Sequence, residues 1–356
     1  MVKKNVLIAI MACFTFILAC SKDENDKEFF NVKNYHQSFV DDIIIPSTTD
    51  LVTNTKTLND AIIDFTSTIN ETNLSTLRNA WKNTAISFSK AEIGNLGDVQ
   101  NLAIYLSIYS WGANEDKIEE FIASTTTISD NDVNSLPTKA RGLSAIEYLI
   151  FENDIPTTIA SFSNQRRNDF LSVLGKNVTE KVNLLDTQWK NYSNNFINNT
   201  STGINGSINF IVNQMNFLLE NVRRFKIGEP AGLENSSTID VTLLQADKSR
   251  ISLALIKENI ASIKSAYYGN TEGLDDYVRT IATNEDVNDA INKAFFDIEN
   301  NITSLSNTTL KNAIEANDSI VSQLHNNIKD LIILIKVDVA SILSVTVTFT
   351  DNDGDS

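Results

Sequence analysis

Apolar residues recur at the spacing of an α-helix along nearly the whole chain after Phe39. Positions three or four residues apart share one face of a helix, so this spacing predicts helices that bury one side. We expect helices over residues 36–69, with an interruption near Pro46, and over residues 74–93, 156–193 and 207–226. The clearest apolar series predicts a further helix over residues 310–342 and consists of Leu310, Ile314, Ile320, Leu324, Ile328, Leu331, Ile335, Val339 and Ile342.

Two polar stretches that contain glycine separate these predicted helices. Residues 198–206 read NNTSTGING, and residues 227–232 read IGEPAG, in which Pro and Gly stop a helix. The first stretch is the predicted boundary between an N-terminal helical bundle, residues 34–200, and a C-terminal helical bundle, residues 201–356. One strand is predicted at residues 345–350, VTVTFT, where β-branched residues alternate. The predicted fold class is therefore all-α, with two helical bundles.

The first 19 residues have the pattern of a lipoprotein signal peptide. Lys3 and Lys4 precede an apolar run from Val6 to Ala19, which is shorter than the roughly 20 residues that span a bilayer. The ending ILAC resembles a bacterial lipobox, in which Cys20 would become the lipidated first residue of the mature chain and bind it to a membrane. An ordinary cleaved signal peptide is the alternative.

A charged segment follows Cys20. Residues 21–28 read SKDENDKE and contain no apolar side chain, so residues 20–33 are predicted to form a disordered acidic tether. This run also resembles the Lys-Asp-Glu signal that directs lipoproteins of Bacteroidetes to the outer face of the outer membrane. The expected location is the bacterial outer membrane, with a lipid anchor and exposure at the cell surface.

Cysteine content and charge exclude several classes of function. The only other cysteine, Cys13, lies within the predicted signal peptide, so the mature chain would have no disulfide and no thiolate nucleophile. Loss of Lys3 and Lys4 leaves 27 basic residues against 45 acidic ones, a net charge of −18. Such a surface repels phosphate backbones, so nucleic acid is not an expected partner.

Six stretches resemble those of imelysin-like proteins in order and spacing. They are RNAWKNTAISFSKAE, YSWGANEDKIEEFI, RGLSAIEYLIF, RRFKIGEPAGL, ISLALIKENIASIKSAYYG and LIKVDVASILSVTVTFTDNDGD. The resemblance covers nearly all of the predicted mature chain and implies two helical bundles with a site in the cleft between them. It also implies two kinds of function, because the family was catalogued among peptidases and related domains belong to bacterial iron-uptake systems.

The hallmark of that family is Gly-x-His-x-x-Glu, and residues 142–147 of this chain read GLSAIE. Gly142 and Glu147 match the hallmark, whereas Ser144 replaces the histidine. Residues three apart on a helix lie about 5–6 Å apart, so a His and a Glu there could share a metal ion or a proton. A serine hydroxyl binds transition metals poorly and does not buffer a proton near neutrality. Glu92, where the resemblance implies a second Glu, could add a carboxylate, and this pair would suit a hard divalent cation such as calcium.

Three interpretations of this motif remain open. In a structural interpretation, Gly142 permits close helix approach, Ser144 donates to the carbonyl four residues before it, and Glu147 belongs to a polar cluster. In a binding interpretation, the three motif residues and Glu92 hold a small ligand or a divalent cation, and Ser249 and Arg250 are weaker candidates. In a catalytic interpretation, the motif glutamate activates a water molecule for hydrolysis.

No known catalytic constellation supports the peptidase interpretation. His36 and His325 do not form a His-Glu-x-x-His motif, and there is no Gly-x-Ser-x-Gly elbow. Residues 351–355, DNDGD, resemble the start of a calcium loop but lack its later glutamate and helix, so an acidic turn is favoured. We therefore expect a surface lipoprotein that binds a ligand or cation rather than catalysing a reaction. Its partners, as the resemblance implies, would be iron-uptake proteins.

Overall fold

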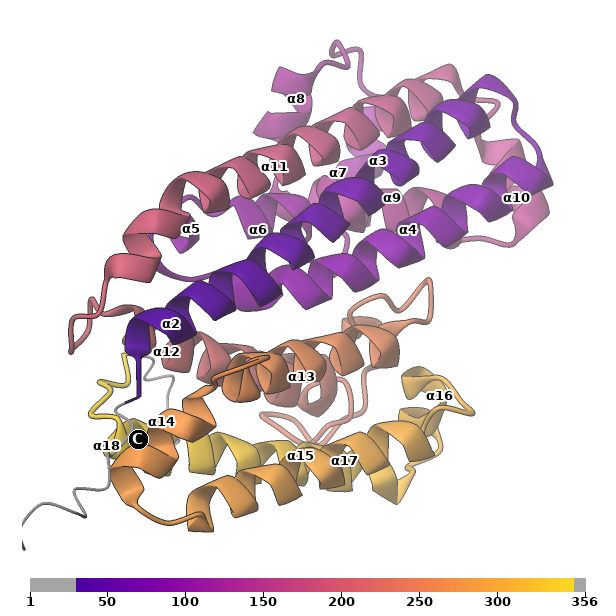
Figure 1. Ribbon diagram of the computed structural model, residues 1–356. Coiled ribbons are helices and arrows are strands. Elements are labelled where there is room, and N and C mark those ends of the chain that lie inside the picture. Colours follow the sequence, from indigo (N-terminus) through magenta and orange to yellow (C-terminus); the bar gives the residue numbers. More distant parts are fainter. Residues whose placement is uncertain (1–29, 349–356) are drawn as a thin grey trace, which may run out of the picture. The chain divides into compact units, whose positions relative to one another are not determined.

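The structure is a computed structural model that describes residues 30–348 (Figure 1). From Val32 onward, the described residues belong to one compact unit. The predicted signal peptide, Cys20, most of the predicted tether and the acidic turn at residues 351–355 lie outside the described residues. Within residues 30–348, no helix is both long enough and apolar enough to cross a membrane.

Three long helices lie side by side in the first half of the chain (Figure 1). Helix α3 (Ile45–Ser67) packs along both α4 (Glu71–Ala91) and α11 (Gln165–Asn198). Shorter elements surround these three: α2 (Val32–Ser38), η1 (Phe39–Ile44), η2 (Glu92–Gly94), α5 (Gly97–Gln100), α6 (Ile104–Ile108), α7 (Glu115–Ala123), α8 (Asp130–Ser135), η3 (Thr138–Ala140), α9 (Gly142–Phe151) and α10 (Ile155–Ser161).

The second half of the chain forms another set of packed helices. Helix α12 (Ser207–Glu220) runs directly into the π-helical turn η4 (Asn221–Gly228), and α15 (Asp286–Ser304) packs along α17 (Ser319–Ile333). The remaining elements are η5 (Val241–Leu243), α13 (Ser252–Tyr268), α14 (Leu274–Ala282), α16 (Leu310–Glu315), η6 (Leu334–Val339) and α18 (Ala340–Ile342).

Helix α13 connects the two sets of helices. It packs on α4 from the first half and on α12, α14 and α15 from the second half. This arrangement of helices, without a strand in residues 30–348, confirms the predicted all-α bundle fold. The predicted boundary at residue 200 falls in the loop between α11 and α12, but the division of the chain into two separate domains stays a prediction.

The first predicted helix begins earlier than expected and does not break at Pro46. Val32 and Lys33, which the sequence placed in the tether, begin α2, and the helical path continues through η1 and α3. Pro46 is the second residue of α3, and one residue separates it from the end of the wider π-helical segment η1. A π-helical turn alters the backbone pairing locally, and the missing N–H of a proline is tolerated best at the start of a helix.

The predicted helix over residues 310–342 is interrupted at residues 316–318. Asn317 adopts φ of 52°, which no α-helix accommodates, and the side chain of Asp318 accepts a hydrogen bond from the N–H of Ile320 at 2.9 Å. Asp318 therefore caps a new helix, α17. The apolar series continues across this break because α16 and α17 each bury one apolar face.

The predicted strand does not form in residues 345–348. These residues instead lie against α12, where two asparagine side chains bind their backbone. The N–H of Thr346 donates to Asn209 Oδ1 at 2.8 Å, and its carbonyl accepts from Asn213 Nδ2 at 2.9 Å. Asn213 Oδ1 accepts from the N–H of Thr348 at 2.8 Å. The β-branched pattern thus marks an extended segment whose backbone partner is a pair of helical side chains.

Candidate functional site

The motif residues lie on α9, which is buried along almost its whole length. Every residue from 142 to 150 is buried, and the helix packs on both α4 and α11. A helix buried on all sides is apolar all round, so the serine and the glutamate of this one need partners. The partners of each motif residue decide between the three interpretations.

Gly142 occupies a position that only glycine fits. Its φ is +64°, and a Cβ atom there would lie 2.5 Å from the carbonyl oxygen of Ile108 at the end of α6. An L side chain would therefore meet both backbone strain and a collision with main-chain atoms. The expected close approach is confirmed, although the partner is the backbone at the end of α6.

Ser144 has its hydroxyl engaged by the backbone. The side chain is 1% exposed, and its Oγ donates a hydrogen bond to the carbonyl oxygen of Ser110. The structural interpretation expected donation to the carbonyl four residues earlier, and that detail is wrong. The hydroxyl instead ties α9 to the loop between α6 and α7. The next residue of that loop, Trp111, has its ring beside the buried ammonium of Lys226.

Glu147 is a buried carboxylate held from the second half of the chain. It is 7% exposed, and its Oε1 accepts a hydrogen bond from the backbone N–H of Ser249 at 2.9 Å. Burial raises the pKa of Glu147 to about 7, a change that the hydrogen bonding from Ser249 opposes, while Asp247 raises it and Lys248 lowers it. Glu147 therefore gains or loses a proton near neutral pH.

Glu92 lies at the end of α4 and is bound by a buried lysine. Its Oε2 accepts hydrogen bonds from Lys226 Nζ at 3.1 Å and from Asn259 Nδ2 at 2.8 Å. Lys226 is 1% exposed, donates to Asn259 Oδ1 at 2.6 Å and lies 5.3 Å from the centroid of the Trp111 ring. Burial lowers the pKa of Lys226, and the charge of Glu92 opposes that shift. We call Glu92, Lys226 and Asn259 the lysine cluster.

A buried tyrosine lies within electrostatic reach of both glutamates. Burial raises the pKa of Tyr109 well above its ordinary value, and the charges of Glu147 and Glu92 raise it further. Tyr109 is 3% exposed and packs edge-on against Trp81. The two predicted carboxylates are therefore brought near the same buried phenol, but each is held by different groups of the protein.

The weaker candidates, Ser249 and Arg250, belong to the loop between η5 and α13. Ser249 is buried and binds Glu147, whereas Arg250 is exposed. The neighbouring Lys248 fixes the same loop through an ion pair with Glu115 at 2.7 Å and a contact with Glu152. The structure therefore brings Ser249 to the motif and leaves Arg250 on the outside of the same loop.

In the part of the chain that the structure describes, neither predicted carboxylate belongs to a cluster of metal ligands. The described part of the chain contains no group of three or more His, Cys, Asp and Glu side chains that could hold one. At Glu92, a cation would meet the ammonium of Lys226, which already occupies the carboxylate. The two histidines have other partners: His36 Nδ1 lies 3.3 Å from the carbonyl of Ile197, and His325 Nε2 lies 2.7 Å from Glu234. The predicted metal site at Glu147 and Glu92 thus gains no support from this geometry and stays a prediction.

Sequence reasoning missed the two groups that matter most at this site, Lys226 and Asn259. A signal for the first was present, because Lys226 follows the buried Val222 by four residues and so occupies an apolar position of the helix. Asn259 likewise lies between apolar residues on the buried face of α13. A lysine on an apolar face predicts a buried partner of opposite charge.

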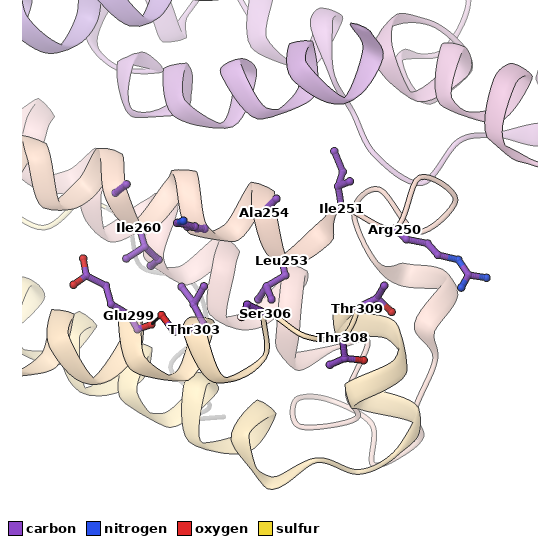
Figure 2. A pocket seen from close by; sticks show the side chains of 13 residues that line it. Arg250, Ile251, Leu253, Ala254, Ile260, Glu299, Thr303, Ser306, Thr308 and Thr309 are labelled. Carbon is purple, nitrogen blue, oxygen red and sulfur yellow. Dashed lines mark hydrogen bonds between the residues drawn. The ribbon is translucent and has the colours of Figure 1, made fainter. Parts of the chain in front are cut away.

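The structure also contains an open groove beside this loop, between α13 and the segment formed by α15 and residues 305–309 (Figure 2). Its volume is about 670 Å³. Arg250 lies at one end of the groove and Glu299 at the other, as Figure 2 shows. The motif residues are not among those that line it.

Comparisons with known proteins agree with this architecture. The family model described as Imelysin matches residues 44–334. A solved structure assigned as an iron-regulated protein A precursor from Parabacteroides distasonis has a TM-score of 0.74 at 18% identity, covering 91% of this chain and 97% of that one. An imelysin-like protein from Psychrobacter arcticum has a TM-score of 0.72 at 16% identity, covering 89% and 97%. No curated protein matches the chain.

Removal of the buried ammonium tests the lysine cluster. We expect Lys226→Met to lower the free energy of unfolding by about 3 kcal/mol, because it leaves the partly buried carboxylate of Glu92 without its counter-charge. Lys264→Met is the matched control, since its ion pair with Glu299 is far more solvated than that of Lys226, with the two side chains 35% and 45% exposed, and is worth less than about 1 kcal/mol. Urea unfolding followed by circular dichroism measures both. Equal losses in the two variants would contradict a special role for Lys226.

The raised pKa of Glu147 predicts a dependence of stability on pH. Its folded pKa, about 7, lies above the ordinary value of 4.5, so the folded protein holds the proton more tightly. This contribution is complete below pH 4.5 and is lost as the pH rises through 7, which costs about 3 kcal/mol between pH 4.5 and 8. We expect Glu147→Gln to remove that loss in urea unfolding at a series of pH values.

A second variant distinguishes the effect of Glu147 from that of Asp275, a carboxyl whose pKa is also raised. Burial raises the pKa of Asp275 to about 6, so the wild type also loses stability through that group. Asp275→Asn should keep the loss of stability that Glu147 causes between its unfolded pKa of 4.5 and its folded pKa of about 7. If Glu147→Gln and the wild type follow the same pH profile, the proposed titration of Glu147 is wrong.

Proposed function

Because the chain belongs to the imelysin family, we propose that it is a lipid-anchored, non-catalytic binding protein of the bacterial outer membrane that serves iron or nutrient acquisition. One observation supports the non-catalytic part of this proposal. Both candidate glutamates, Glu92 and Glu147, accept hydrogen bonds from groups in the second half of the chain. Lys226 and Asn259 bind Glu92, and Ser249 binds Glu147. These carboxylates join helices rather than face a substrate.

A hydrolase remains the second candidate because of one specific feature. A carboxylate with a pKa of about 7 has the proton affinity of an effective general base. A general base must also reach the proton that it abstracts, and Glu147 is 7% exposed and lines no part of the groove beside α13. Burial against Ser249 favours the binding protein over the hydrolase.

The link to iron acquisition is drawn at the level of the family. The solved structure from Parabacteroides distasonis is assigned as an iron-regulated protein, and it shares the fold of this chain. The proposal of a lipid anchor and a surface location rests on Cys20 and on the charged segment after it. A binding protein tethered at the cell surface suits capture of a solute before its transfer to a transport protein.

The proposal is tested first on the mature protein purified without chelator. We expect elemental analysis to find no stoichiometric iron, zinc or calcium, and we expect no cleavage of casein or of a peptide library. Glu147→Ala is assayed beside the wild type. Stoichiometric metal or cleavage that disappears in Glu147→Ala would overturn the non-catalytic proposal and restore the metal or hydrolase interpretation.

The anchor is tested in the native cell. We expect Cys20→Ala to lose incorporation of labelled palmitate and to lose surface exposure to an externally added protease. A deletion strain should grow more slowly in medium depleted of iron by a chelator, with recovery by the wild-type gene but not by Cys20→Ala. Ser21→Ala is the matched control and should behave like the wild type. Normal growth of the deletion strain in that medium would remove the link to iron.

A further inference from the structure

The groove between α13 and α15 has the size of a small-molecule site. Its volume of about 670 Å³ lies within the roughly 300–1,000 Å³ of typical ligand pockets. In Figure 2, Leu253 and Ile260 project from α13 toward α15, and Thr303, Ser306 and Thr308 lie along the opposite wall. The groove therefore offers an apolar surface with a set of hydroxyl groups on one side.

The groove carries more positive than negative charge. Arg250 and Lys257 both line the groove, and neither forms an ion pair within residues 30–348. The carboxylate of Glu299 also lines it but is paired with Lys264 at 2.8 Å. In a chain with a net charge of −16, two uncompensated cations beside one apolar groove attract an anion there.

The backbone holds Arg250 at the end of the groove. Its φ is 60°, an uncommon value for a residue other than glycine, and its N–H donates to the carbonyl of Ala246 at 2.8 Å. The preceding residue, Ser249, is bound by Glu147. Such locally strained positions persist where the surroundings fix them and are frequent at ligand sites.

From these observations we propose that the groove binds a small organic anion that has an apolar body. The deduction rests on the proposed function as a binding protein and adds the location and chemical class of its ligand. The anionic group lies at Arg250, whose guanidinium suits a carboxylate or sulfonate, with Lys257 adding a second positive charge. The apolar body lies along Leu253, Ile260 and Ile302.

The test compares two fluorescent probes that differ in one charged group. 1-Anilinonaphthalene-8-sulfonate carries a sulfonate, and N-phenyl-1-naphthylamine has the same rings without it. We expect the sulfonate probe to bind with a stoichiometry of one and to be displaced by decanoate. The double variant Arg250→Gln/Lys257→Gln should weaken the sulfonate probe at least about tenfold and leave the neutral probe unchanged, and Lys329→Gln is the matched surface control.

A blocking variant confirms the location. Ala261 is exposed and lines the groove, so Ala261→Trp should fill it and weaken both probes without unfolding the chain. Unchanged binding in Ala261→Trp, equal loss of both probes in the charge variant, or no binding of either probe would overturn the groove proposal. Those results would leave the binding-protein proposal standing, because its own tests are metal content and peptide cleavage.

Discussion

The buried ammonium of Lys226 is the interaction on which the central packing depends. It lies where the end of α4, the π-helical turn η4 and the middle of α13 meet, and it binds one side chain from each of the other two elements. Removal of a lysine from water is costly, and only a close counter-charge with further hydrogen bonds compensates for it. Glu92, Asn259 and the face of Trp111 supply these. The cluster thus fixes the register of α13 against α4, since a shift of either helix would leave a buried charge without a partner.

Buried polar groups need partners, and this also explains why the polar residues of the α9 motif are closed off from solvent. Ser144 and Glu147 sit in a helix with no exposed face, so each is tied to backbone groups outside its own helix. Ser110 accepts from one, and Ser249 donates to the other. A histidine in place of Ser144 would need more room and a second partner. The smaller serine still donates a hydrogen bond to the carbonyl of Ser110. The motif therefore holds α9 against neighbouring segments of the chain.

The sequence predicted the elements much better than it predicted their partners. The apolar period located α4, α11 and α12, because burial of one helical face is a local property of the chain. The sequence analysis also named Glu147 and Ser249, which do contact each other. Both came from the resemblance to imelysin-like proteins and not from the apolar spacing. Lys226 was missed because its charge suggests solvent when the sequence is read one residue at a time. The apolar position of Lys226 could have indicated its burial, but its partners lie 33 and 134 positions away in sequence, and no local pattern identifies them.

Two asparagines on α12 have a consequence for the extended segment at residues 345–348. Asn209 and Asn213 are one helical turn apart, about 6 Å along the axis, and two residues of extended chain span about 6.6 Å. This near match lets a helix present amides at the repeat of a β-strand, so that Thr346 and Thr348 are bound on one side as if by a neighbouring strand. An exposed strand edge invites pairing with other copies. The helix occupies one such edge of residues 346–348, so another copy of the chain cannot pair along that edge while these bonds hold.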